Sequence, residues 1–178
     1  MSATQETPGF WDWSLHIYGE DDVSRACLIL QDRHGLDINM VLWCVWAVRA
    51  GYGIIDDDTL AGGHAFATDW NSRITSALRG VRRNLRPAPA GTPIEWAEAL
   101  RANTLEVELD AERVEQDFLQ ALLDGLQDPS EAADLSPRRA RQVALNNLVA
   151  YADMAGADGV DLERIGAFDP LLAAAFPG

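Results

Sequence analysis

The chain has 178 residues, of which 48% are apolar and 24% charged, so it is long enough for one domain with a substantial core. Its formal net charge is −14, and all 14 basic residues are arginines. A strongly acidic chain is poorly suited to non-specific DNA binding. The absence of lysine excludes a Schiff-base lysine and the usual phosphate-binding loop.

The sequence gives no sign of export or of membrane insertion. Its longest apolar run covers residues 40–48, whereas a membrane helix needs about 20 apolar residues. The first ten residues lack the basic and apolar stretches of a secretory signal. Two cysteines, Cys27 and Cys44, form no Cys-x-x-Cys motif, which gives no disulfide framework. We therefore expect a cytoplasmic protein, with a disordered tail over residues 1–7.

Helical periodicity runs through nearly the whole chain, and no stretch alternates as a strand would. Pro8 opens a first helix that ends at Gly19. A second helix covers about residues 23–34, with Gly35 as the residue after its end. Asp37 caps a third helix that is apolar on almost every face to about residue 50, which is typical of the buried centre of a bundle.

The second half of the chain begins with weaker signals. A fourth helix starts near Asp56 and is expected to be interrupted or to end near Gly62 and Gly63, and a better helix begins at Thr68 or Asp69. Residues 86–93 are a proline-rich linker, and Pro93 opens a long helix to about Leu126 with a strongly acidic exposed side. Its apolar stripe comprises Trp96, Leu100, Val107, Ala111, Val114, Phe118, Ala121 and Leu122. Further helix starts lie at Ser136-Pro137 and Asp169-Pro170.

These patterns predict an all-α, single-domain bundle of about six to eight helices over residues 8–176. The central apolar helix covers about residues 37–50. The N-terminal helical half comprises residues 8–86, and the acidic long helix and the C-terminal helices comprise residues 93–176.

The polar turn between the second and third helices is the first candidate site. It gathers a carboxylate, a guanidinium and an imidazole within nine residues, and His34 could act as an acid or base oriented by Asp32 or Asp37. The alternative is a structural corner, in which Asp37 caps a helix, Arg33 pairs with an acid and His34 binds a free carbonyl. The candidate residues are Gln31, Asp32, Arg33, His34, Asp37 and Asn39.

The same turn, Leu30 to Asn39 (LQDRHGLDIN), resembles an uncharacterised proteobacterial family of hypothetical proteins, each roughly 160 residues long. The resemblance covers about residues 10–125. It also includes Phe10–Ser14, Leu42–Cys44, Trp70 with Arg79-x-x-Arg82-Arg83, and Glu106–Arg113. The family is known as a domain of unknown function, so the resemblance implies a bacterial origin and a shared fold and carries over no catalytic residue.

A cluster of arginines is the second candidate site. Their helical spacing gives a basic face in an acidic protein, and arginine forks suit phosphate, RNA or acidic partners. The alternative is ion pairing with the acidic long helix. The candidate residues are Arg73, Arg79, Arg82, Arg83 and Arg86.

Aromatic residues near the N-terminus form the third candidate. Trp11 and Trp13 cannot both be buried on one helical face, so we expect one of them to lie at the surface as an interaction anchor. Residues 56–58 are three aspartates without the remainder of a calcium loop, and we interpret them as a helix cap.

No complete catalytic set is present. The sequence lacks a His-Glu-x-x-His zinc motif, a dinucleotide fingerprint and a nucleophile elbow. We therefore expect no metal, no cofactor and a non-enzymatic module that binds a protein partner. An enzyme or small-ligand binder using residues 31–39 is the alternative, and an RNA or anion binder using residues 79–86 is the weaker one.

Overall fold

The computed structural model describes residues 8–126, 129 and 134–177, and all regular structure in this part is helical. The prediction of an all-α, single-domain bundle is confirmed, whereas the expected tail over residues 1–7 lies outside the described residues. None of the described helices is long and apolar enough to cross a membrane. The elements are α1 (Phe10–Tyr18), α2 (Asp21–His34), α3 (Ile38–Arg49), α4 (Asp57–Trp70), the π-helix η1 (Asn71–Thr75), α5 (Ser76–Asn84), α6 (Ile94–Leu126), α7 (Pro137–Met154), α8 (Gly159–Arg164) and α9 (Asp169–Ala175).

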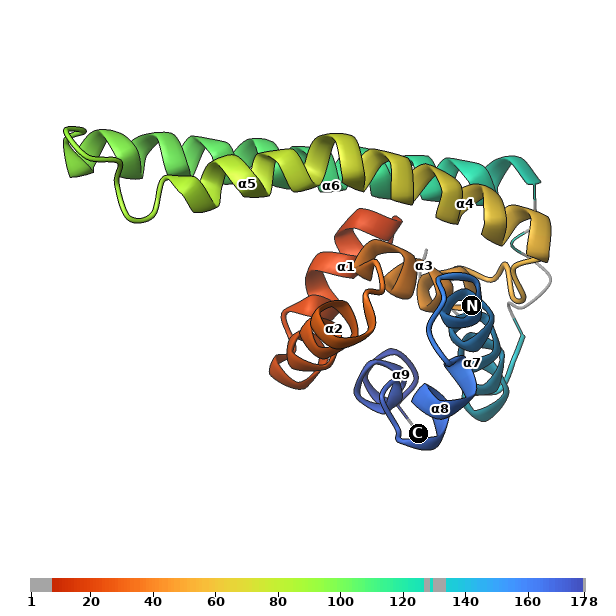
Figure 1. Ribbon diagram of the computed structural model, residues 1–178. Coiled ribbons are helices and arrows are strands. Elements are labelled where there is room, and N and C mark those ends of the chain that lie inside the picture. Colours follow the sequence, from red (N-terminus) through yellow and green to blue (C-terminus); the bar gives the residue numbers. More distant parts are fainter. Residues whose placement is uncertain (1–7, 127–128, 130–133, 178) are drawn as a thin grey trace, which may run out of the picture.

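The helices form a body and a long hairpin (Figure 1). The body contains α1–α3 and α7–α9, with α3 at its centre. Every residue from Met40 to Val48 is buried, as the apolar pattern of this segment predicts. Helix α7 makes the most extensive contact with α3, and α1, α2, α4, α6 and α9 complete its cover.

The long hairpin consists of α4, η1 and α5, which run without a break, and of α6, which lies beside them (Figure 1). Thus the described residues form eight continuous helices. Helix α6 has 33 residues, which corresponds to a length of about 50 Å. Because this exceeds the width of the body, α5 and the start of α6 extend past α1 and α2.

Helix boundaries follow the predicted capping residues. Gly35 adopts a left-handed conformation (φ 69°) after α2, which glycine does without steric cost. The Asp37 carboxylate accepts hydrogen bonds from the backbone N–H groups of Asn39 and Met40 at the start of α3. Asp56 and Ser136 cap α4 and α7 in the same way. The short helix α8 was not expected from the sequence.

The predicted interruption at Gly62 and Gly63 is wrong, because α4 continues through both residues. Gly63 is instead a point of close approach. A Cβ atom there would lie 3.0 Å from the ring of Trp43 and 3.1 Å from Leu119, both fully buried. The glycine therefore lets α4 pack directly on α3 and α6.

Helix α6 buries polar residues and exposes much of its predicted apolar stripe. Glu108, Glu115 and Gln116 are buried, whereas Trp96 is 69% exposed and Leu100 and Val107 are about half exposed. The side of α6 that faces α5 and the body meets arginines and amides, which hold these polar groups in place.

Candidate functional site

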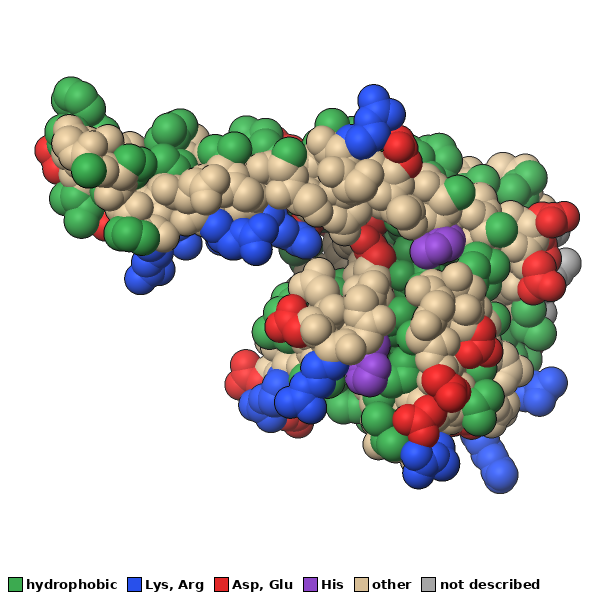
Figure 2. Space-filling view, in the orientation of Figure 1, with side chains coloured by type: hydrophobic (Ala, Val, Ile, Leu, Met, Phe, Trp, Pro, Cys, Tyr) green, Lys and Arg blue, Asp and Glu red, His purple; other side chains and the backbone are tan. Residues whose placement is uncertain are grey.

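A pocket of about 330 Å³ opens where the long hairpin meets the body. Its volume is near the lower end of ligand-binding pockets, which hold roughly 300–1,000 Å³. Acidic side chains are visible in the hollow beneath the hairpin, and arginines lie along the underside of the hairpin (Figure 2). We call this cavity the hairpin pocket. Its lining residues are Trp11, Ser14, Leu15, Tyr18, Gly19, Gln31, Asp37, Ile38, Asn39, Leu42, Asn71, Thr75, Arg79, Leu109, Glu112, Glu115 and Gln116.

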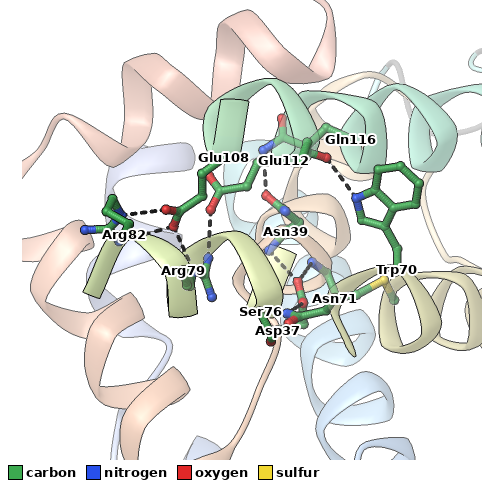
Figure 3. Close-up of polar contacts among 12 residues, drawn as sticks. Asp37, Asn39, Trp70, Asn71, Ser76, Arg79, Arg82, Glu108, Glu112 and Gln116 are labelled. Atoms are coloured by element: carbon green, nitrogen blue, oxygen red, sulfur yellow. Dashed lines mark hydrogen bonds and ion pairs between the residues drawn. The ribbon is translucent and has the colours of Figure 1, made fainter. Parts of the chain in front are cut away.

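A chain of hydrogen bonds joins three helices around the pocket. The Ser14 hydroxyl of α1 donates to Oε1 of Gln116 on α6 at 2.9 Å. The Gln116 amide then donates to Oδ1 of Asn39 on α3 at 2.7 Å (Figure 3). Ser14 and Gln116 are both buried, so these bonds satisfy amide and hydroxyl groups that would otherwise be costly to bury.

Asp37 is held from three sides. Its Oδ1 accepts the two capping hydrogen bonds of α3, and its Oδ2 accepts a 2.9 Å hydrogen bond from the Asn71 amide of η1 (Figure 3). Asn71 in turn accepts a hydrogen bond from the Ser76 hydroxyl. The backbone N–H of Asp37 donates to the Tyr151 hydroxyl of α7 at 2.9 Å. These contacts fix the carboxylate at the edge of the pocket.

The π-helix η1 brings polar side chains to the pocket wall. π-Helical turns are rare and occur frequently at functional sites. Asn71, Thr75 and Arg79 of the continuous α4–η1–α5 helix all line the cavity. Thr75 is 1% exposed, and its hydroxyl has no hydrogen-bond partner among the described residues.

Glu115 is the most unusual residue of the pocket. It is 1% exposed, and its Oε1 has no hydrogen-bond partner in the described part of the chain. Burial, followed by the nearby charge of Asp37, raises the pKa of the Glu115 carboxyl to about 9. The group is therefore protonated at neutral pH and can donate a hydrogen bond as well as accept one.

Two arginines and two glutamates connect α5 to α6 beside the pocket (Figure 3). Arg79 contacts Glu108 at 3.0 Å and Glu112 at 2.7 Å, and Arg82 contacts the other oxygen of Glu108 at 2.6 Å. Burial raises the pKa of Glu108, but the hydrogen bonds from Arg82 and Arg79 outweigh it and leave that pKa below its usual value. For Glu112, burial outweighs the single arginine contact, and its pKa is raised.

Only half of the candidate residues from the polar turn between α2 and α3 line the hairpin pocket. Gln31, Asp37 and Asn39 line the hairpin pocket. Asp32 and Arg33 are exposed and His34 is half-buried in the last turn of α2, and none of the three lines this pocket. The acid–base role considered for His34 therefore has no support from its position.

The arginine candidates are also separated. Arg79 lines the pocket, and Arg79 and Arg82 pair with the acidic long helix. Arg73 pairs with Asp69 one turn earlier at the surface. Arg83 and Arg86 are exposed and lie outside the pocket lining.

The two N-terminal tryptophans have different positions. Trp13 is 6% exposed and belongs to the core of the body. Trp11 is half-buried, lines the hairpin pocket and lies 5.7 Å from the guanidinium of Arg113. Trp11 is therefore the member of the pair that a ligand could contact.

Sequence reasoning missed most of the hydrogen-bonding residues of the pocket. Thr75 and Gln116 were not identified, and the acidic side of the long helix, which carries Glu112 and Glu115, was considered only as an ion-pair partner of the arginines. The available signal was the spacing of Glu108, Glu112 and Glu115, which places three carboxyl groups near one face of a helix. Ser14 and Asn71 carry no such signal.

Metal or thiol chemistry finds no support in the described residues. No group of three or more His, Cys, Asp or Glu side chains among residues 8–126, 129 and 134–177 could hold a metal ion. Cys27 and Cys44 are free and buried, and burial raises the pKa of both thiols, to about 12 for Cys27. Such thiols are unreactive at neutral pH and act as small apolar side chains.

Comparison with known proteins identifies a family for the chain. No curated protein and no solved structure matches the chain. One family profile matches residues 9–119, more than half of the chain, and this segment contains every residue that lines the hairpin pocket. The chain therefore belongs to the family described as "Protein of unknown function (DUF2390)".

Proposed function

We propose that the protein binds a small polar molecule in the hairpin pocket. The observation that carries this proposal is the pair of buried, unpartnered polar groups on its wall, the Thr75 hydroxyl and Oε1 of Glu115. A buried polar group without a partner costs about 1–3 kcal/mol. A ligand that forms these hydrogen bonds offsets that cost, which favours the bound state.

The rest of the lining supports the same proposal. Trp11, Leu15, Tyr18, Leu42 and Leu109 supply apolar and aromatic surface, between which the polar groups converge. A mostly apolar wall with a few fixed polar groups is the usual composition of a small-molecule site. The hydrogen bonds of Ser14, Gln116 and Asn39 fix the wall before any ligand arrives, which lowers the entropic cost of binding.

The test compares two threonine variants. Thr75→Val removes the unpartnered hydroxyl with little change of shape. We expect it to raise the free energy of unfolding by about 1 kcal/mol while weakening the binding of polar small molecules. The matched control is Thr59→Val, because the buried Thr59 hydroxyl donates to Asp56 at 2.7 Å.

The control should lower the free energy of unfolding and leave binding unchanged. Urea titration gives the stabilities, and a ligand-observed NMR screen of small amides, polyols, amines and carboxylates gives the binding. The proposal is wrong if no compound of the screen binds, or if Thr75→Val and Thr59→Val affect binding equally.

A protein-binding role is the second candidate, and a different observation favours it. Leu100, Val107 and Val114 lie at seven-residue intervals along α6, and each is about half exposed. Apolar residues at seven-residue intervals supply one of the two apolar positions of the heptad by which helices pair in coiled coils. The repeat is symmetric about Val107, so it matches a second copy of itself in an antiparallel, two-fold arrangement. We propose a second copy of this chain as the partner.

Molar mass in solution tests this second role. We expect light scattering to show a dimer whose share increases with protein concentration, and Val107→Glu to abolish it. Val160→Glu is the control, because Val160 is an exposed valine of α8, remote in sequence from the repeat. A monomer up to millimolar concentration, or equal effects of both substitutions, would exclude the role.

No observation favours RNA or a phosphate as the ligand. The two arginines closest to the pocket, Arg79 and Arg82, direct their donors at Glu108 and Glu112. An anion would have to displace these carboxylates, which lie on a neighbouring helix and cannot leave.

A further inference from the structure

The charges around the hairpin pocket are unbalanced. Asp37, Glu112 and Glu115 line it, and Glu108 lies directly beside it. Because Glu115 is protonated in the empty pocket, the other three carboxyl groups are compared with two guanidinium groups, those of Arg79 and Arg82, which are already paired with Glu108 and Glu112. A positive charge is therefore what the pocket lacks.

The two unpartnered groups, the Thr75 hydroxyl and Oε1 of Glu115, can accept hydrogen bonds from a donor on the ligand, such as an N–H group. Trp11 and Tyr18 line the same cavity, and the ring of Trp11 already attracts the Arg113 guanidinium. Hydrogen-bond acceptors next to an aromatic face are the usual environment of an organic cation.

We propose, on the basis of the binding function above, that the ligand is a small organic cation with N–H donors, an ammonium or a guanidinium. Its charged group lies against Glu115 and Thr75, and Glu115 loses its proton when the cation binds. The O–H bond of the carboxyl breaks, the proton passes to solvent, and the carboxylate then pairs with the cation.

The groups that face Glu115 explain why it holds a proton in the empty pocket. Burial, the charge and hydrogen bond of Asp37 at the start of α3, and the charge of Glu112 on its own helix favour the neutral acid, whereas a hydrogen bond with Asn39 favours the ionised form. Arg79 and Arg82 of α5 are engaged by Glu108 and Glu112. Tyr151 of α7 and Tyr18 of α1 are uncharged at neutral pH, because burial raises the pKa of both hydroxyls. His64 of α4 contacts the ring of Tyr151. A bound cation reverses this balance, because an opposite charge nearby favours the ionised carboxyl.

Methylguanidinium and methylurea are a suitable pair of probes. They have nearly the same shape and N–H donors, but only methylguanidinium is charged, and it keeps its charge over the whole working range of pH as arginine does. Calorimetry in two buffers of different ionisation enthalpy measures both the affinity and the number of protons released.

For the intact protein we expect methylguanidinium to bind and methylurea to bind at least tenfold more weakly. About one proton should be released per cation near neutral pH, so the affinity should rise by up to tenfold per pH unit between about pH 6 and about pH 8. Glu115→Gln keeps the shape and neutrality of the side chain, and it should remove both the proton release and this pH dependence. Glu106→Gln, at an exposed position of the same helix, should change neither.

The outcomes separate this inference from the function on which it rests. If methylurea binds as tightly as methylguanidinium, the ligand is not selected by charge and the inference is overturned while the binding function stands. If the cation binds without proton release, the role of Glu115 is overturned. If neither probe binds and the wider NMR screen also finds nothing, the binding function itself is wrong.

Discussion

The Thr75 hydroxyl and Oε1 of Glu115 are buried without a hydrogen-bond partner among the described residues. Two further buried atoms, Nε1 of Trp43 and Nδ1 of His64, also lack a partner, but neither residue lines the hairpin pocket. Most other buried polar side chains of the described residues do find partners. For example, the Asn147 amide donates to the carbonyl oxygens of Cys44 and Gly53 and accepts from the N–H of Ile55. Of the four unpartnered buried atoms in the described residues, the two that share this cavity point to a group that the folded chain does not itself supply.

Glu115 should make the stability of the protein depend on pH. Its pKa in the folded state is about 9, well above its value in the unfolded chain, so unfolding above about pH 5 releases a proton. The contribution of this group is therefore complete below about pH 4 and is lost as the pH rises towards 9. Relative to Glu115→Gln, the free energy of unfolding should fall by on the order of 1 kcal/mol per pH unit between about pH 5 and about pH 9.

Urea titrations of the native protein and of Glu115→Gln across this pH range measure the difference between their free energies of unfolding. The titration of the other carboxylates affects both proteins and largely cancels in this difference. A constant difference between the two proteins would show that Glu115 ionises normally in the folded state. If the native protein instead became more stable than Glu115→Gln as the pH rose, the predicted direction of the effect would be wrong.

At the scale of single elements, the π-turn and the glycines of α4 shape the long hairpin. The wider turn of η1 changes which face of the continuous α4–η1–α5 helix meets α6. Before it, Phe66 stacks on Phe118 of α6, and after it Arg79 and Arg82 reach the glutamates of the same helix. One helix can thus contribute both apolar packing and ion pairs to a single neighbour.

The adjacent glycines of α4 should respond in opposite ways to substitution by alanine. Gly62 is exposed and has space for a Cβ, so Gly62→Ala should raise the free energy of unfolding by about 0.5–1 kcal/mol through helix propensity. Gly63→Ala gains the same propensity but forces a methyl group against Trp43 and Leu119, so it should lower the free energy of unfolding by about 1–2 kcal/mol. Thermal and urea unfolding of the two variants test the pair, and a stabilising Gly63→Ala would refute the close packing inferred here.

Local signals predicted the helix ends well, because a cap depends on residues a few positions apart. Asp37, Asp56, Ser136 and Gly35 each act where the sequence places them. The orientation of α6 was not predictable in this way. Its buried Glu108 is stabilised by Arg79 and Arg82, more than 25 positions earlier, and only the folded hairpin brings these charges together.

In the candidate site, too, the residues that are close in sequence were predicted and those brought together by the fold were not. Asp37 and Asn39 were identified because the polar turn is compact in sequence, and the structure places both on the pocket wall. The opposite wall comes from η1 and α6, where Thr75 and Glu115 follow no motif. Residues of one pocket that come from distant helices leave no common pattern along the chain.

At the scale of the whole molecule, the pocket lies at the junction of two parts. Trp11, Asp37 and Asn39 belong to the body and its connections, whereas Thr75 and Glu115 belong to the long hairpin. The cluster of Arg79, Arg82, Glu108 and Glu112 joins α5 to α6 within the hairpin. Any shift of the hairpin against the body would change the width of the pocket and would couple ligand binding to the position of the projecting end.

The contact between α3 and α7 has a consequence for relatives of different length. The family segment ends at residue 119, whereas α7, which covers the apolar centre of the body and binds the N–H of Asp37 through Tyr151, begins at Pro137. A relative that stopped at the end of the shared segment would leave the Val- and Trp-rich surface of its third helix open to water, and would tend to aggregate. This surface therefore needs a cover, and in this protein α7, which lies beyond the matched segment, supplies it.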